Sequence, residues 1–238
     1  MSIDNFTKRA EAYAKGRPGY TKEAVGKIME LVPKDAVFAD IGAGTGKLTK
    51  ELAKQGYNIY AVEPNEDMRR QLAITLEAST NVKIVDGTAE NTTLSDKSID
   101  VITVAHALHW FDMEDFRAEC HRILKPDGLV LVIYNHVPGK EENDFCRQAV
   151  DQFFSDPVFW TFDNPISYTR DNWIAYIQSQ DDSILPGEQG YEEYISSLNK
   201  VFDQDSVNGV LCCDRLIRIY SERTQDHEMD EIQNKNNY

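Results

Sequence analysis

Short runs of β-branched and apolar residues alternate with longer amphipathic stretches over residues 35–134. This alternation is typical of βαβ units, in which parallel strands are joined by crossover helices that cover the sheet. The apolar runs predict five strands, at residues 37–41, 58–62, 82–85, 99–104 and 129–134. We therefore expect an α/β fold with a mostly parallel sheet.

Helix signals fall between these strands. Thr21 is a good capping residue for a helix over 21–31, and a second helix is predicted over 46–55. Asp112 is placed to begin a third helix, whose apolar residues follow the spacing of one buried face. The sequence Pro-Asp-Gly at 126–128 then predicts a turn into the fifth strand.

The alternation weakens after Asn135. Residues 141–155, 171–178 and 191–202 predict helices, 158–167 a weak extended stretch, and 210–220 a last strand. We expect a single domain over 1–238, with a core and N-terminal cover segment in 1–135 and a helical cap in 136–205. A closing strand at 206–220 and a polar tail at 221–238 complete this division.

Charge narrows the choice of partners. The net charge of −15 gives an average surface that repels phosphate backbones and anionic lipid head groups. We therefore expect neither nucleic acid nor a membrane as partner. The first thirty residues contain no apolar stretch of signal-peptide or membrane-helix length, so a cytoplasmic location is expected.

Cysteine and histidine spacing does not favour a metal site. The cysteines at 120, 146, 212 and 213 form no C-x-x-C pair, and the histidines include no H-E-x-x-H motif. We expect no bound metal and read the cysteines as reduced thiols.

The strongest local signal is the segment Asp-Ile-Gly-Ala-Gly-Thr-Gly at 40–46, directly after the first strand and before a helix. Alternate glycines let the backbone turn tightly and approach a ligand that lies across the strand end. In open α/β sheets, ligands bind outside the carboxyl ends of the strands. The segment therefore predicts a cofactor-binding loop.

The identity of that cofactor depends on details of the loop. A dinucleotide loop has glycine at the sixth position counted from Gly42, where this chain has Lys47, and Asp40 would lie beside the phosphates. A P-loop needs glycine at position 41 and serine or threonine at 48, and the chain has Ile41 and Leu48. Both NAD and ATP are disfavoured.

S-adenosylmethionine suits the loop better. It carries an ammonium and a sulfonium group and no phosphate, so an acidic Asp40 at the strand end is compatible with it. Glu63, at the end of the second strand, is placed to accept hydrogen bonds from both ribose hydroxyls.

Several motifs in this order and spacing resemble class I S-adenosylmethionine-dependent methyltransferases. The similarity is to the small-molecule group related to trans-aconitate methyltransferase, with a methyltransferase type 11 domain. The matching stretches are 6–20 (F-x3-A-x2-Y-x3-R-P-G-Y), 39–46, 61–68 (A-V-E-P-N-E-D-M), 87–90, 105–112 (A-H-A-L-H-W-F-D) and 122–128 (R-I-L-K-P-D-G). The resemblance implies a Rossmann-like fold, with a mostly parallel seven-stranded sheet, helices on both faces and a helical cap inserted before the last strand.

The same resemblance implies cofactor contacts at the matching positions. Glu63 would hold the ribose, Met68 would pack against the adenine, and Arg17 would pair with the methionine carboxylate. Thr88 departs from the pattern, since many relatives have aspartate there. The full set of expected cofactor residues is Tyr13, Arg17, Asp40, Gly42, Ala43, Gly44, Gly46, Glu63, Pro64, Met68, Thr88, Ala89, Glu90, Ala105 and His106.

The acceptor site is less well marked. Tyr20, His109, Trp110 and Arg170 are the expected substrate-pocket residues, with Arg170 as an anchor for an anionic acceptor and His109 as the candidate general base. Ordinary packing under the cap is the competing interpretation for the aromatic residues and for His109.

Methyl transfer from a sulfonium is an in-line displacement that needs alignment and exclusion of water, and a carboxylate acceptor needs no base. We expect such an enzyme, a monomer or homodimer, with a small-molecule acceptor. The alternatives are a catalytically silent relative that binds the cofactor or a partner, a methyltransferase for a larger isoprenoid or protein acceptor, and a nicotinamide oxidoreductase, which the loop disfavours.

Overall fold

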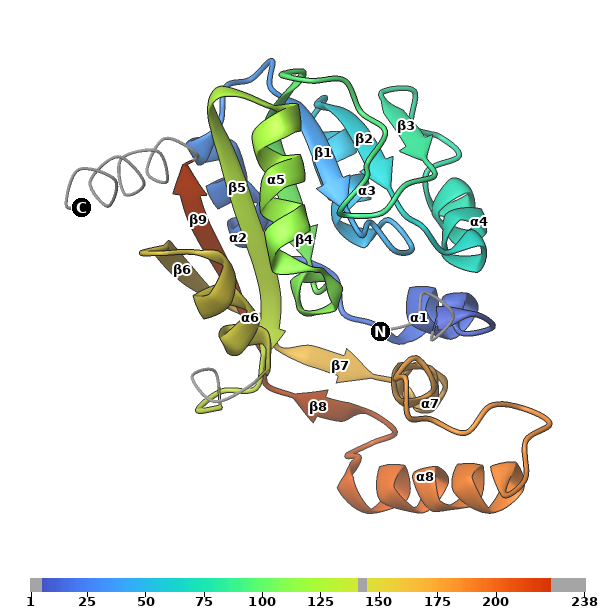
Figure 1. Ribbon diagram of the computed structural model, residues 1–238. Helices are drawn as coiled ribbons and strands as arrows, with labels where there is room; N and C mark the ends of the chain where they lie inside the picture. Colours follow the sequence, from blue (N-terminus) through green and yellow to red (C-terminus); the bar gives the residue numbers. More distant parts are fainter. Residues whose placement is uncertain (1–5, 141–144, 224–238) are drawn as a thin grey trace, which may run out of the picture.

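A seven-stranded sheet forms the centre of the protein, whose computed structural model describes residues 6–140 and 145–223 (Figure 1). The strand order is β3-β2-β1-β4-β5-β9-β6, and β9 runs antiparallel to both of its neighbours. The mostly parallel α/β sheet predicted from the sequence is confirmed. The strands are β1 (Val37–Ile41), β2 (Asn58–Val62), β3 (Val82–Val85), β4 (Ile99–Ala105), β5 (Leu124–His136), β6 (Val158–Asp163) and β9 (Leu216–Arg223).

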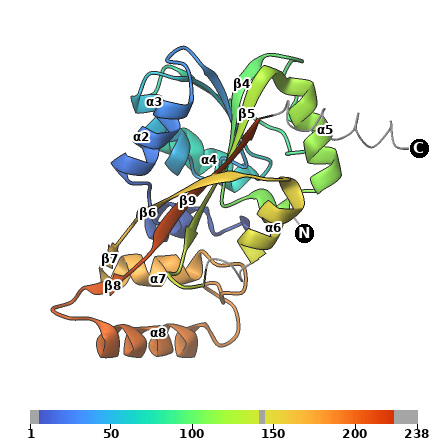
Figure 2. The same cartoon turned by 90° about the vertical axis from the view of Figure 1, so that its left-hand side faces the viewer.

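Helices cover both faces of this sheet (Figure 2). On one face, Ile28 and Leu52 pack with Phe38 of β1, and on the other Phe116 and Val150 belong to a second apolar cluster with strands β4 and β5. Burial on both faces explains why the central strands are rich in apolar residues. The helices are α1 (Ala10–Gly16), α2 (Lys22–Leu31), α3 (Lys47–Lys54), α4 (Glu66–Thr75), η2 (Leu108–Trp110), α5 (Met113–Ile123), α6 (Phe145–Phe153), α7 (Arg170–Gln178) and α8 (Tyr191–Asp205).

Side-chain caps begin several of these helices. Thr21 accepts the backbone N–H of Ala24 at the start of α2, as predicted. Asp112 accepts the backbone N–H groups of Glu114 and Asp115 at the start of α5, which is also as predicted. Each cap satisfies amide donors that have no partner within the helix.

The predicted turn at 126–128 is wrong in detail, because these residues lie within β5. The pairing of β5 with β4 jumps from Leu124 opposite Ile99 to Leu129 opposite Val101, so the intervening residues bulge from the ladder. Asp127 takes a positive φ of 62° in this bulge. The Pro-Asp-Gly sequence bends the chain locally, but the strand pairs with β4 on both sides of the bend, which depends on β4 and not on the local sequence.

The second half of the chain contains more strands than predicted. The extended stretch at 158–167 forms β6 and β7 (Ile166–Tyr168), and the single strand expected over 210–220 is divided into β8 (Leu211–Cys213) and β9. β7 pairs with β8 in a separate two-stranded sheet. The region 136–205 is therefore not purely helical.

The predicted start of the polar tail at 221 is also wrong. Ser221 and Glu222 are buried because β9 continues to Arg223 alongside β5, with Ser221 also paired to β6. The rest of that tail, residues 224–238, lies outside the described residues, as do 141–144 at the start of the helix expected over 141–155.

Helices α1 and α7 lie side by side beyond the carboxyl ends of the strands (Figure 1). A Cβ atom on Gly16 would lie 2.1 Å from the backbone nitrogen of Tyr176, so the two helices meet with no side chain between them. The Arg9 guanidinium, almost fully buried, donates hydrogen bonds to backbone oxygens of Gln178, Asp181 and Ser183. These contacts tie the N-terminal cover to the cap.

Candidate functional site

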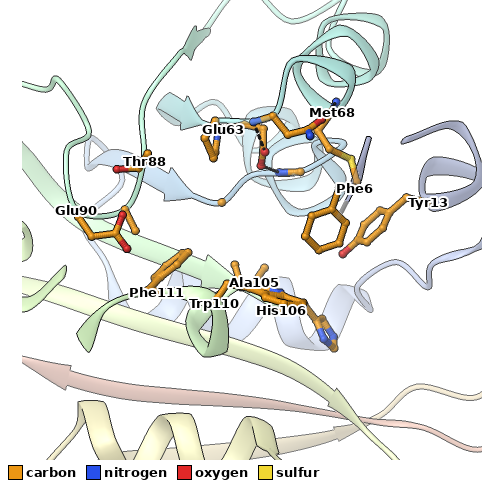
Figure 3. Close-up of a pocket in the computed structure, with 16 residues that line it drawn as sticks. Phe6, Tyr13, Glu63, Met68, Thr88, Glu90, Ala105, His106, Trp110 and Phe111 are labelled. Atoms are coloured by element: carbon orange, nitrogen blue, oxygen red, sulfur yellow. Dashed lines mark hydrogen bonds between the residues drawn. The ribbon is translucent and has the colours of Figure 1, made fainter. Parts of the chain in front are cut away.

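A cavity of about 230 Å³ opens at the carboxyl ends of β1, β2 and β4. We call it the first cavity. Figure 3 shows Thr88, Glu90 and Phe111 at one end, Phe6, Tyr13 and Met68 at the other, and Glu63 opposite Ala105 and Trp110. The lining residues are Phe6, Tyr13, Gly42, Gly44, Glu63, Pro64, Asn65, Met68, Thr88, Ala89, Glu90, Ala105, His106, Ala107, Trp110 and Phe111.

The glycine loop forms one wall. Gly42 and Gly44 have φ values of 67° and 56°, which residues with a side chain rarely adopt. A Cβ on Gly44 would come no nearer than 4.0 Å to the Tyr13 ring, so the loop backbone is bare beneath Tyr13.

Gly46, expected among the cofactor residues, has a structural role at the start of α3. It lines neither this cavity nor the two that adjoin it. Its φ of 83° forms the N-cap of α3, and a Cβ there would lie 2.5 Å from the Leu72 side chain of α4. The motif glycine serves the turn and the packing of α3 against α4.

Glu63 is anchored at both carboxylate oxygens. Oε2 accepts the backbone N–H of Gly44 at 2.8 Å, and Oε1 accepts that of Asn65 at 2.9 Å. Burial raises the pKa of this carboxyl, while the two N–H groups and the charge of Arg69 oppose the shift. Each oxygen keeps a further lone pair, which suits a ligand with two adjacent hydroxyl groups.

The loop after β3 closes the far end of the first cavity. Thr88 accepts the backbone N–H of Asn91, and the Glu90 carboxylate accepts the backbone N–H of Asp112 at 3.0 Å. Glu90 thereby joins this loop to the start of α5.

A second cavity, of about 330 Å³, adjoins the first at Tyr13, the glycine loop and His106. Arg17, Tyr20, Asp40 and Ala43, all expected at the site, line it together with Lys47, Lys140 and Arg215. Asp40 is 1% exposed and accepts hydrogen bonds from Thr49 (2.5 Å) and Thr103 (2.8 Å). Burial raises the pKa of Asp40 to about 6, against the opposing effect of the threonine hydroxyls.

Arg17 is held by α7. Its Nε donates to the Ser179 hydroxyl at 2.8 Å, and its guanidinium lies 5.0 Å from the Tyr13 ring centre and 5.5 Å from that of Tyr176. The side chain therefore faces the second and third cavities between two aromatic rings.

The third cavity, of about 580 Å³, lies between the N-terminal segment, η2 and α6. His109 and Trp110 line it, with Phe145 and Gln148 from α6. Nδ1 of His109 lies 3.2 Å from the hydroxyl of the buried Tyr134.

Arg170 does not line any of these three cavities. Its guanidinium donates to Oδ1 of Asn199 at 3.1 Å, pairs with Asp203 and lies over the Phe202 ring. The residue ties α7 to α8. The expectation that Arg170 anchors an acceptor is wrong, because the sequence does not show which neighbouring helix the Arg170 side chain of α7 packs against.

Sequence reasoning missed several lining residues, notably Phe6, Asn65 and Ala107. Each of these residues lies inside one of the motif stretches. They could have been predicted by treating every position of those stretches as a possible ligand contact. Among residues 6–140 and 145–223, no cluster of histidine, cysteine and acidic side chains is suited to a metal ion, and no helix is long and apolar enough to span a membrane.

Comparison with known proteins places this geometry in context. Residues 39–132 match the family model described as a methyltransferase domain. An uncharacterized methyltransferase of Mycobacterium tuberculosis is 36% identical over 135 residues, which make up 57% of this chain and 53% of that protein. The chain thus spans about half the length of the curated relatives it matches.

Solved structures share the fold at low sequence identity. The YcgJ protein from Bacillus subtilis has a TM-score of 0.54 and 18% identity, covering 85% of this chain and 99% of its own. Phosphoethanolamine N-methyltransferase 2 of Haemonchus contortus, in complex with phosphomonomethylethanolamine and S-adenosylhomocysteine, has a TM-score of 0.52 and 15% identity over 93% of this chain and 59% of its own. These likenesses show the fold that this chain shares with those proteins.

Proposed function

We propose that this protein is an S-adenosylmethionine-dependent methyltransferase acting on a small-molecule carboxylate, in the group related to trans-aconitate methyltransferase. The observation that carries the proposal is the hydrogen bond between Gly44 and Glu63, which joins the bare glycine loop to a buried carboxylate in one cavity. That arrangement presents acceptors for ribose hydroxyls beside a backbone that a ligand can approach closely.

The residues present fit this cofactor. Glu63 would hold the ribose, with Met68 and Pro64 beside the adenosine and the loop at 88–90 at the adenine edge. Thr45 lines the second cavity, and its buried hydroxyl has no hydrogen-bond partner among the described residues. A buried hydroxyl without a partner is costly, and because a hydroxyl both donates and accepts, a polar ligand group beside it would lower that cost.

S-adenosylmethionine supplies, when bound, a methyl group on a positively charged sulfur that leaves as a neutral thioether. The chain has to align the acceptor with that methyl group and exclude water. Tyr13 borders all three cavities, and α1 that carries it is tied to α7. This pair of helices would cover the reacting atoms.

The charges of the second cavity favour an anionic acceptor. Arg17, Lys47, Lys140 and Arg215 line it, against the single carboxyl of Asp40, in a chain whose net charge is −15. A positive cavity in an acidic protein concentrates anions locally. A carboxylate is ionised at neutral pH, so no general base is needed, and His109 would act as one only for a phenol, amine or carbon acceptor.

The division into a cofactor-binding core, a cap and a closing strand, the cytoplasmic location and a monomeric or homodimeric state are part of the same proposal. The second candidate is a relative that binds the cofactor without turnover, because fold alone does not fix function. Methyl transfer to any acceptor would exclude it.

Calorimetric titration with S-adenosylmethionine and S-adenosylhomocysteine, beside NAD, tests the cofactor. We expect saturable binding of the first two, weakened roughly 10–100-fold in Glu63→Gln, since hydrogen bonds to a charged group contribute about 1.5–3 kcal/mol. Glu66→Gln, on the exposed first turn of α4, is the matched control and should bind as the wild type does. Absence of S-adenosylmethionine binding to the wild type would refute the proposal.

A further inference from the structure

His106, like Tyr13, lines all three cavities. It directly follows β4 and takes a φ of 57°, a left-handed conformation that residues with a side chain seldom adopt. Such a conformation costs about 1–3 kcal/mol and persists where the surroundings enforce it.

One ring nitrogen of His106 is already used. Nε2 accepts the backbone N–H of Asn135 at 2.7 Å. A backbone amide can only donate, so Nε2 carries no proton.

A second donor reinforces this assignment. The side-chain nitrogen of Asn135 lies 3.0 Å from the same Nε2. Asn164 donates to Oδ1 of Asn135 at 2.8 Å, which turns the amide nitrogen of Asn135 toward the ring. The end of β5 and the turn after β6 thus fix one face of His106.

The ring is uncharged. Burial, together with the charges of Arg17, His109 and His136, lowers the pKa of His106 to about 3. A neutral imidazole with a bare Nε2 must carry its proton on Nδ1.

Nδ1 is available to a ligand. Nδ1 has no hydrogen-bond partner among the described residues. It is also not one of the unpartnered polar atoms that are buried away from solvent. The ring therefore presents one N–H donor, of fixed orientation, to the cavities it lines.

We infer that His106 is a positioning residue, held by Asn135 as the Nδ1–H tautomer, and that it donates this hydrogen bond to a carboxylate of the acceptor. The inference rests on the proposed function. One carboxylate oxygen accepts the N–H, and the other forms the new bond to the methyl carbon while the carbon–sulfur bond breaks and its electron pair stays on sulfur. No proton moves, so His106 is not a general base.

The tautomer is read directly by NMR of the full chain labelled with 15N-histidine, with the His106 signals assigned by their loss in His106→Asn. We expect a pyrrole-type Nδ1 and a pyridine-type Nε2, unchanged between pH 8 and pH 5. A protonated Nε2, or an imidazolium in this range, would overturn the inference. This measurement needs no cofactor, so it stands apart from a failure of S-adenosylmethionine to bind.

The ligand is tested on protein saturated with S-adenosylhomocysteine, with acetate, succinate and citrate as carboxylate probes and acetamide and succinamide as neutral ones. We expect a carboxylate, and neither amide, to shift the His106 Nδ1–H signal. A signal that none of the carboxylates moves would contradict the inference.

Two variants separate the donor from the fold. Asparagine tolerates a positive φ and offers an amide donor near the position of Nδ1, whereas leucine offers none. The carboxylate that shifts the signal should bind within threefold of wild type in His106→Asn and at least tenfold more weakly in His106→Leu, while the two variants should differ from each other by no more than twofold in S-adenosylhomocysteine affinity. Weakened S-adenosylhomocysteine binding in His106→Leu would instead make His106 a cofactor ligand.

Discussion

Replacing Gly16 with alanine tests whether the N-terminal cover and the cap act as one unit. The added Cβ would lie 2.1 Å from the backbone nitrogen of Tyr176 and 2.4 Å from the backbone carbon of Ala175. Ordinary carbon contacts begin near about 3.5 Å, so α1 and α7 would have to separate by roughly 1.5 Å. Neither of these atoms belongs to a flexible side chain that could rotate away.

The expected cost follows from that geometry. Overpacking a close contact costs about 1–3 kcal/mol, while alanine regains about 0.5–1 kcal/mol over glycine in a helix, so we expect a net loss of roughly 1–2 kcal/mol. Separation would also strain the hydrogen bonds from Arg17 to Ser179 and from Arg9 to the end of α7. Because α1 carries Tyr13, the affinity for S-adenosylmethionine should fall up to about tenfold.

Urea unfolding and calorimetric titration measure the two effects. The matched control is Gly26→Ala in α2, where an added Cβ meets nothing within 4 Å. That control should be as stable as the wild type or up to about 1 kcal/mol more stable. If Gly16→Ala matched the wild type in both measurements, the close contact between α1 and α7 would be refuted.

Two further predictions concern Asp40 and Arg170. Folding raises the pKa of Asp40 from 3.8 to about 6, so the folded state binds more protons than the unfolded state between these pH values. The free energy of unfolding should therefore fall by about 3 kcal/mol as pH rises through that window. Urea unfolding from pH 4 to pH 7 should show this fall in the wild type and not in Asp40→Asn, and an equal fall in the variant would disprove the prediction. Arg170→Ala should leave the Kd for S-adenosylhomocysteine within twofold of the wild-type value. It should lower Tm by no more than about 4 °C, since the ion pair with Asp203 is partly exposed. A large loss of affinity in the titration would show that Arg170 does take part in binding.

The sequence was most informative where local pattern and burial coincide. The first three strands have the predicted bounds, because each is a short run rich in β-branched and apolar residues that is followed by glycine or an acidic residue. The motif stretches likewise located most of the first cavity, since their residues follow the carboxyl ends of neighbouring strands.

What the sequence could not supply is pairing between distant segments. The bulge at 125–128 depends on how β5 meets β4, and the break between β8 and β9 depends on two different partner strands. Arg170 was misplaced for the same reason, because helical periodicity shows that a residue is on a surface but not which surface it faces. The donor role inferred for His106 rests on contacts with Asn135, 29 positions away, that no local pattern reveals.

The small sheet of β7 and β8 has an evolutionary consequence. Ile166 is opposite Cys213 and Tyr168 is opposite Leu211, so the chain enters and leaves the segment 169–210 at the same point. Insertions or deletions within that segment leave the register of β6 and β9 unchanged, because the pairing of β7 with β8 holds the two ends of the segment together whatever its length. The segment is thus an exchangeable module, and its main constraint is that α7 must still present a surface that α1 can meet without a side chain between them.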